Sequence, residues 1–525
     1  MSINLRRHYP LLILLVALVS GLVFVLGDAR VISYTSRKDS AAKTNTDTVD
    51  YSNDVALFDD SAVHSIQVLM SEADYDSMLT TYQKTGLKEY FHADVIIDGV
   101  RIDDVGVRLK GNASLSTALR RGMGGGGNRP NNGQQPNNRQ FPNNRQFPNG
   151  TPQAPGNMPQ RPGMLGNGQN FQPPANAQMP GAGPGGAPNG FGAQVSSDKK
   201  KIPFMIKFNE YTDQTYQGYT NVSIRTYGTS YNEALLAEPL TNLVARQAGI
   251  PATQTAFSGF RINDNEETLY VISELVNEDY LEKYFGNADG ILYKAEIGST
   301  LTYQGEDPSS YTRSFTQQTR LNDADFAPLI EFMRFLDQAD DATFERELPM
   351  YLDVDSFATY LAVNAVLVNT DSMIGMNNNY YLYYDEETKR FSVLMWDTNE
   401  SLGKLGGNTN LDISLTNTGG GPGGRGGMPG GGGGMGRGQN ALINRFLANA
   451  TFKALYQEKL RAVYEVAFDN GTLTETVAHY SDLIHSVNEK REVVDIDAYD
   501  QAVQKVRDFI SQRMEYLNTT ELLSQ

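Results

Sequence analysis

Four polar side chains near the middle of the sequence have the types and spacing that metal-dependent phosphoryl transfer requires. Asp371, Asn379 and Asp397 fall within one stretch of the chain, and Asn399 follows two residues after the last of them. Phosphoryl transfer depends mainly on positioning the reactants and neutralising charge, and carboxylate and amide oxygens are suited to hold Mg²⁺ on a triphosphate. We predict Asp371 and Asp397 as the catalytic acids. The predicted metal ligands are Asp397, Asn379 and Asn399.

The elements around these residues are predicted to hold them in place. A helix with an apolar face over Val354–Leu367 leads to Asp371. Two β-prone runs, Tyr380–Tyr384 and Phe391–Met395, flank a polar turn and predict a hairpin between the two acids. An acid on a loop, an Asn, two short strands and a second acid follow the order found in kinase active sites. In that layout Asp371 accepts the proton of the substrate hydroxyl or helps to hold the metal.

Each of these residues also has a simpler interpretation. An Asp after a helix is common, and the triplet Asn377 to Asn379 also fits an ordinary turn. Asp397, however, follows an apolar strand and the only tryptophan, Trp396. A carboxylate at the end of a buried strand costs several kcal/mol unless a cation or hydrogen-bond donors satisfy it. The combination favours one functional site over unrelated turns.

A lysine and a glutamate in the first half of the chain are candidates for the nucleotide side of the site. Lys207 lies in a predicted strand, Pro203–Phe208, on the face opposite its large apolar residues. A phosphate-binding lysine on such a strand usually pairs with a helix glutamate, and Glu238 and Glu233 lie on the predicted helix Asn232–Gln247. A solvated strand lysine is the simpler alternative.

Two further segments fit a nucleotide site through their backbone. Gly111 to Ser114 could form a small phosphate-binding loop, with Asn112 and Ser114 as its polar residues, although a short Gly-Asn turn is a weak signal. The last predicted strand of the first half ends just before a helix, where the backbone of a kinase hinge reaches adenine. The residues of this predicted hinge are Glu274, Leu275 and Val276.

Composition excludes several other chemistries and partners. The 525-residue chain has no cysteine, which excludes disulfides, thiolate metal sites and cysteine nucleophiles. The five histidines are scattered, and neither a Walker A loop nor a GxSxG motif is present. A net charge of −17 makes nucleic acid an unexpected partner and disfavours adsorption to anionic membrane surfaces.

The N-terminus predicts export. An uncharged apolar run, Leu11–Gly27, follows Arg6, Arg7 and His8. We prefer an uncleaved single-pass membrane anchor over residues 1–30 to a cleaved signal peptide, because the run is long for a signal core. Residues 31–54 are predicted as a polar stalk. In both interpretations the body of the protein lies outside the cytoplasmic membrane.

The remainder predicts an α+β, two-lobed body. Residues 55–277 are rich in predicted strands, and residues 278–525 are mostly helical apart from the hairpin region 371–403. Two low-complexity segments interrupt the lobes. The first, residues 121–197, is built of Gly, Pro, Asn and Gln with a repeated NNRQFP, and the second, residues 419–438, is almost all Gly. Both are predicted to be disordered, because they cannot bury enough apolar surface to offset the entropy of ordering.

Several segments resemble the CotH family, the spore-coat-protein-H-type atypical protein kinases. They are VGVRLKGNAS, KKIPFMIKF, NEALLAEPLTNLVARQAGIPA, LYVISELVNEDYLEKYF and DSMIGMNNNYYLYYD followed by LMWDTNESLG. The resemblance implies a kinase-like fold that uses ATP with Mg²⁺ or Mn²⁺ to phosphorylate Ser or Thr of surface or spore-coat proteins. It also implies that Asp371 and Asp397 are the active-site acids.

The chain departs from the family pattern at two positions. Family members commonly have His-Asn before the first hairpin strand, whereas this chain has Asn378-Asn379. Many members read WDxD, and here Asn399 replaces the second acid, which keeps an oxygen ligand but loses a charge.

Two alternatives to a protein kinase remain open at this point. One is a non-catalytic cell-surface or spore-coat assembly protein on a degenerate kinase fold. The other is a kinase-like enzyme that transfers nucleotidyl rather than phosphoryl groups.

Overall fold

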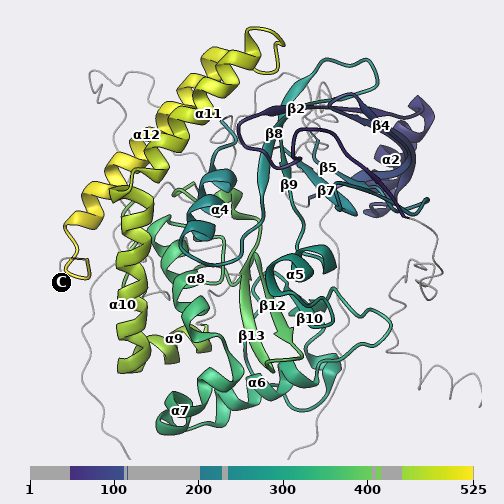
Figure 1. Cartoon of the computed structure of the whole chain (residues 1–525). Coiled ribbons are helices and arrows are strands. Elements are labelled where there is room, and N and C mark those ends of the chain that lie inside the picture. Colours follow the sequence, from purple (N-terminus) through teal and green to yellow (C-terminus); the bar gives the residue numbers. More distant parts are fainter. Residues whose placement is uncertain are drawn as a thin grey trace, which may run out of the picture.

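The computed structural model describes residues 48–111, 115, 202–226, 234–404, 409–415 and 440–523. The predicted anchor, residues 31–47 of the predicted stalk, both low-complexity segments and the candidates Asn112, Ser114 and Glu233 lie outside these residues. The stalk prediction is wrong for its last residues, because Val49–Tyr51 form a strand that pairs with Gln214–Tyr216. Within the described ranges, no helix has the length and apolar character needed to cross a bilayer. Figure 1 shows a β-barrel beside a body of helices that surround a small sheet, so the predicted α+β class is confirmed.

Seven strands of the first half close into a barrel. Their order is β2-β3-β4-β5-β7-β9-β8, in which β2 and β8 are parallel and the other neighbouring strands are antiparallel. The bounds are β2 Val63–Leu69, β3 Phe91–Ile97, β4 Val100–Leu109, β5 Phe204–Lys207, β7 Asn221–Arg225, β8 Thr255–Ile262 and β9 Thr268–Ser273. Alternate residues such as Ile66, Val95 and Ile102 fill its interior. The barrel therefore has a core of its own.

Two helices accompany the barrel, and one begins later than predicted. Helix α2 (Glu72–Thr85) starts after Ser71, whose hydroxyl accepts from the Asp74 amide. Helix α4 (Ala237–Gln247) follows β7 but begins at residue 237 rather than at Asn232. Leu235 just before it has φ +56°, a conformation that no α-helix interior contains. Two short strands, β1 (Val49–Tyr51) and β6 (Gln214–Tyr216), pair in parallel outside the barrel.

The second half contains more β-structure than predicted. Strands β10 (Ile291–Ala295) and β11 (Phe315–Gln317) join the predicted hairpin, β12 (Tyr380–Asp385) and β13 (Arg390–Met395), in an antiparallel sheet. The sheet order is β11-β10-β12-β13. An isolated hairpin is at best marginally stable in water, so partner strands are what make it a rigid element.

Helices enclose this sheet. The largely helical character of the second half is confirmed, with α5 Glu278–Phe285, α6 Ala327–Gln338, α7 Asp341–Tyr351, α8 Val354–Val366, α9 Ala441–Ala448, α10 Ala450–Tyr464, a π-helical turn Glu465–Asp469, α11 Thr472–Asn488 and α12 Ile496–Asn518. Helix α8 is buried over most of its surface and packs against α10 and β13. It leads directly into the Asp371 segment.

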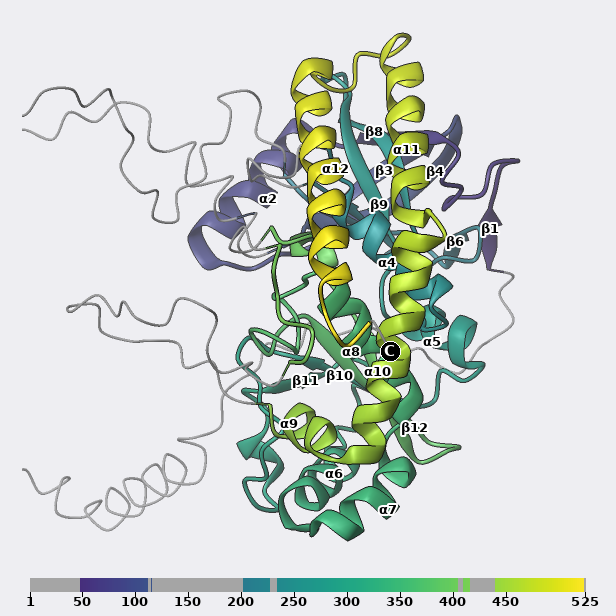
Figure 2. The same ribbon diagram turned by 90° about the vertical axis from the view of Figure 1, so that its left-hand side faces the viewer.

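The last two helices reach from the helical body to the barrel. Figure 2 shows α11 and α12 running upward beside β8 and β9. The amide of Leu269 in β9 donates to the Val493 carbonyl (2.8 Å), and Arg491 donates to the Val63 carbonyl (2.8 Å). The C-terminal helices thus bind the two halves of the molecule together.

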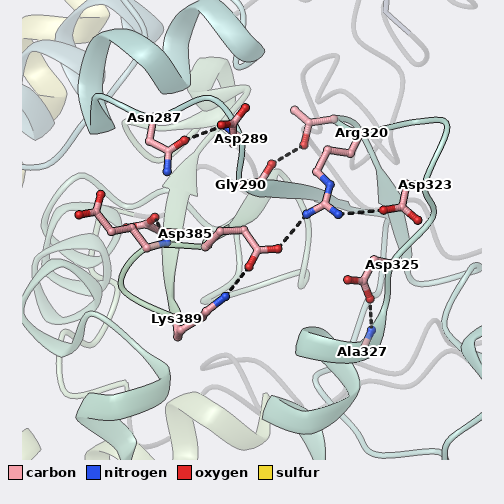
Figure 3. A network of polar contacts seen from close by, with 12 residues as sticks. Asn287, Asp289, Gly290, Arg320, Asp323, Asp325, Ala327, Asp385 and Lys389 are labelled. Carbon is pink, nitrogen blue, oxygen red and sulfur yellow. Dashed lines mark hydrogen bonds and ion pairs between the residues drawn. The ribbon is translucent and has the colours of Figure 1, made fainter.

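A polar network fixes the end of the hairpin that lies far from Asp397 (Figure 3). Arg320 donates to Glu386 (2.8 Å) and to Asp323 (2.9 Å), and Lys389 donates to the same Glu386 (2.6 Å). Glu386 and Lys389 belong to the turn between β12 and β13, whereas Arg320 follows β11. The network therefore ties the hairpin turn to the neighbouring segment of the sheet.

Candidate active site

The loop that carries Asp371 is fixed by a chain of buried side-chain amides. Asn364, in the last turn of α8, donates to the Tyr360 carbonyl (2.8 Å), and Asn369 donates to the Asn364 side chain (2.8 Å). The Ser372 hydroxyl then donates to the Asn369 carbonyl (2.7 Å). Because buried polar groups that are satisfied in this way rigidify a segment, the backbone on both sides of Asp371 is held in one conformation.

Asp371 is mostly buried and bound by two of the three predicted asparagines. The Asn379 amide donates to the Asp371 carboxylate (2.9 Å) and to its carbonyl oxygen (3.0 Å), while Asn378 donates to the other carboxylate oxygen (3.2 Å). Burial raises the pKa of Asp371 to about 6, the charge of Asp397 adds to the rise, and the two amide hydrogen bonds oppose it. A carboxyl group with this pKa can accept a proton near neutral pH.

Asp397 follows the second hairpin strand and lies at the same open end of the hairpin as Asn379, because Tyr380 pairs with Met395. It follows β13 with φ +54°, a strained conformation that directs the chain into a short 3₁₀ turn, Thr398–Glu400. Its side chain is 36% exposed and therefore remains partly accessible to solvent. Its negative charge adds to the rise in the pKa of Asp371, so the two predicted acids lie within electrostatic reach of each other.

The cation that pairs with Glu238 is Arg225, and the predicted pair between Lys207 and Glu238 is wrong. The guanidinium of Arg225, at the end of β7, contacts Glu238 (3.1 Å) and also Asp397. Lys207 instead pairs with Glu210 (2.5 Å), three residues further along its own segment. Arg225 pairs with Glu238 because strand β7, which ends at Arg225, is the strand that precedes helix α4, whereas Lys207 lies on the earlier strand β5. Whether Lys207 contacts a nucleotide stays a prediction.

Lys110 is a second basic residue at the site, and it was not predicted as a site residue. It directly precedes the proposed phosphate-binding loop at Gly111. Its ammonium donates to the Ser223 hydroxyl (2.6 Å) and lies 4.7 Å from the centre of the Trp396 ring. Arg225 lies over the same ring, at 5.6 Å. Burial and the charge of Arg225 hold the pKa of Lys110 well below its usual range. Two cations therefore face the indole next to Asp397.

An apolar cluster of buried residues packs between the barrel and the sheet. It comprises Met205, Leu275, Val276, Tyr280, Leu281, Leu292, Tyr381, Tyr383, Leu394 and Trp396. Leu275 and Val276 of the predicted hinge belong to this cluster. The Glu274 carboxylate accepts hydrogen bonds from Lys283 (2.8 Å) and from the backbone amide of Gln254 (3.0 Å). Its side chain is therefore engaged within the protein, which leaves the backbone as the part of Glu274 that could bind a ligand.

Two further charged residues near the acids were missed. Burial raises the pKa of Glu400, and the charges of Asp371 and Asp397 add to that rise. Lys404, which donates to the Asn399 carbonyl (3.2 Å), has its pKa lowered to about 7 by burial, against the opposing charge of Glu400. The sequence spacing could have indicated Glu400, because a 3₁₀ turn places residues three apart on the same side and Glu400 follows Asp397 by three residues. Asn399 itself donates to Glu400 (3.2 Å).

The donor set fits a metal that arrives with a nucleotide. Among the described residues, no group of three His, Cys, Asp or Glu side chains could hold a metal by itself. Mg²⁺ in nucleotide sites commonly takes only one or two carboxylates, and phosphate oxygens and water complete its shell. Asp397 and Asp371, with the amide oxygens of Asn379 and Asn399 nearby in the chain, match that requirement.

Comparison with known proteins adds a family to this geometry. The model of the CotH kinase protein family matches residues 189–517, more than half of the chain. The chain belongs to the CotH kinase protein family. The family match includes Arg225, Glu238 and both acids, whereas Lys110 precedes it.

The individual proteins similar to this chain have low sequence identity to it. The inner spore coat protein H of Bacillus subtilis (strain 168) is 25% identical over 213 residues, which span 39% of this chain and 56% of that protein. The chain thus matches little more than half the length of this CotH relative. The crystal structure of the proinflammatory kinase CtkA of Helicobacter pylori aligns over 59% of this chain and 96% of that chain, with 10% identity and a TM-score of 0.25.

Proposed function

We propose that this member of the CotH family is an atypical protein kinase that transfers the γ-phosphoryl group of ATP to Ser or Thr hydroxyls. The observation that carries the proposal is the convergence of three elements. The ends of one hairpin bring Asp371 and Asp397 within electrostatic reach of each other, and Arg225 connects Asp397 to Glu238 on α4. Family membership supports the same activity.

In this proposal each group has one task. Asp397, with Asn379 and Asn399, holds Mg²⁺ or Mn²⁺, which neutralises charge on the phosphates when it is bound. Arg225 and Lys110 face the same space and contact phosphate oxygens. Asp371, deprotonated above about pH 6, accepts the proton of the acceptor hydroxyl. The apolar cluster around Trp396 receives the base and excludes water from it.

The location and the substrate class belong to the proposal as well. The basic and apolar N-terminus supports a single-pass membrane protein whose catalytic body faces outward. An enzyme in that position acts on surface or coat proteins. The name of the Bacillus relative, an inner spore coat protein, supports the second of these classes.

The decisive experiment is phosphate transfer by the purified full-length chain. We expect label from [γ-³²P]ATP with Mn²⁺ to appear on a generic acceptor protein, and the Asp397→Asn variant to lose this activity. Asp412→Asn is the matched control, because Asp412 is an exposed acid whose side chain, among the residues that the structure describes, accepts hydrogen bonds from Ser414. Label transferred from α-labelled ATP instead would indicate a nucleotidyl transferase. A chain that shows no metal-dependent thermal stabilisation by ATP would be a non-catalytic surface or coat-assembly protein.

A further inference from the structure

Arg513, near the end of α12, is the largest charged side chain in the described core. It is 0% exposed, and its guanidinium donates four hydrogen bonds, all of them to backbone carbonyl oxygens. The acceptors are Val366 (3.0 Å) and Ala365 (2.8 Å) for Nε and Nη2, and Thr409 (2.8 Å) and Leu411 (3.0 Å) for Nη1. A buried charge with this many well-formed bonds is a specific structural element, since an unsatisfied one would cost several kcal/mol.

The chemistry of this contact suits a cation that stays charged. Burial lowers the pKa of Arg513 only to about 10, so the side chain carries its charge at neutral pH. Two of its acceptors are carbonyls in the last turn of α8, at the negative end of the helix dipole, and that of Ala365 also accepts from the Val368 amide (3.3 Å). Within the described part of the chain, Arg513 therefore caps the helix that leads to Asp371.

The same guanidinium lies where the two acid-bearing segments meet. Val366 is five residues before Asp371, and the next carbonyl, that of Leu367, accepts the Leu402 amide (2.8 Å). Leu402 is five residues after Asp397. Thr409 and Leu411 continue the chain beyond that second segment. One side chain thus connects the backbone before Asp371 with the backbone after Asp397.

This junction contains strained backbone that needs external support. Val368, Asp397 and Leu402 have φ values of +53°, +54° and +58°. For a β-branched residue such as Val368 this region is a genuine outlier, and such conformations persist only where surrounding contacts over-determine them. The four bonds from Arg513 flank the strained residues on both sides.

We propose that Arg513 is a positioning residue that sets the distance and orientation between Asp371 and Asp397. It acts through the backbone carbonyls rather than on the substrate, and it makes α12 a working part of the active site. The catalytic consequence rests on the proposed kinase activity, whereas the positioning itself does not.

The test compares Arg513→Lys with Arg507→Lys, a matched change at an exposed position of the same helix. Lysine keeps the charge but has no planar group that could bind two pairs of carbonyls. Because small misplacements of catalytic groups have large effects, we expect the kcat of Arg513→Lys to fall roughly 10²-fold, with the KM for ATP little changed. Arg507→Lys should match the wild type. Equal kcat per folded molecule in Arg513→Lys and wild type would overturn the proposal.

Hydrogen exchange gives a readout that does not depend on activity. In Arg513→Lys the amides of Leu402 and Gly403 should exchange faster, while those of β8 in the barrel keep their protection. Unchanged exchange at residues 402–403 would contradict the positioning role, even if the chain proved to have no phosphotransfer. If Arg513→Lys does not fold, Arg513→Ala with millimolar guanidinium replaces it. Restored protection at Leu402 would then support the proposal, and lack of restoration would oppose it.

Discussion

The two ends of the β12–β13 hairpin differ sharply, although the same two strands connect them. At the outer end, Glu386 forms ion pairs with both Arg320 and Lys389 in a partly exposed turn. At the inner end, Asn379 and Asp397 both have positive φ, and burial raises the pKa of Asp371. Positive φ occurs at both ends, because Lys389 in the outer turn has φ +58°. The ends differ in electrostatics: the charges of the outer turn are paired, whereas the inner end holds a desolvated acid.

This contrast shows how a small sheet can support an unfavourable site. Strained and desolvated groups persist only where the rest of the fold holds them, and catalytic groups are most precise on rigid elements. The hairpin is rigid because β10 pairs with β12 and because Arg320 fixes its turn. We therefore expect substitutions at the inner end to change function more than stability, and substitutions at the outer end to do the reverse.

The largest expected effect is that of Asp371→Asn. The variant keeps the shape of the side chain but cannot accept a proton, so kcat should fall by about 10²- to 10⁴-fold, the usual contribution of general base catalysis. Radiolabel transfer under saturating ATP measures this loss, with Asp412→Asn as the unaffected control. A variant that retained most of its turnover would show that Asp371 is not the base.

The pH dependence of the wild type examines the same group. Turnover should rise with an apparent pKa near 6 as Asp371 loses its proton. Stability should change in the opposite direction. Since the folded pKa is about 6 and the usual value is 3.8, the folded state binds more protons in this window, and stability falls as pH rises through it. Thermal melts of Asp371→Asn should show a smaller fall between these pH values, and an identical fall would contradict the assignment.

A smaller but more complex effect is expected for Arg225→Met. Glu238 is only 1% exposed and also accepts from the Ser273 hydroxyl (3.0 Å), so the variant removes the positive charge that Arg225 supplies to a buried carboxylate. Breaking a buried ion pair in this way typically costs about 3–5 kcal/mol. ATP binding should weaken as well. The double variant Arg225→Met/Glu238→Gln should regain stability but not ATP affinity, as measured by denaturant unfolding and by the fluorescence of the single Trp396. Recovery of both properties would show that Arg225 has a structural role alone.

Sequence patterns predicted the local elements of the fold better than their long-range pairing. Hairpin strands β12 and β13 followed from β-prone runs around a polar turn. Strands β10 and β11 were missed because they are short, and their β-structure depends on pairing with residues far away in the sequence. Helix α4 was predicted five residues too long because periodicity alone does not reveal the positive φ of Leu235.

The same division applies to the candidate site. Asp371, Asn379 and Asp397 could be proposed together because their order along the chain carries the information. Arg225 was missed although it ends strand β7, the last strand before the helix that carries Glu238. Recognising the pair would have required comparing the end of one element with the start of the next. Arg513 could not be found at all, because nothing in the sequence shows that α12 crosses the end of α8.

The smallest effect is expected at the outer end of the hairpin, for Arg320→Met. Arg320 and Glu386 are partly exposed, and pairs of this kind contribute about 0.2–1 kcal/mol each, so the free energy of unfolding should fall only slightly. Turnover and the KM for ATP should not change, because β10 still pairs with β12 along four residue pairs. Denaturant unfolding and steady-state kinetics of the same preparation separate the two quantities. A clear loss of turnover in Arg320→Met would mean that the conformation at Asp397 depends on the far turn, and that the two ends of the hairpin act as one unit.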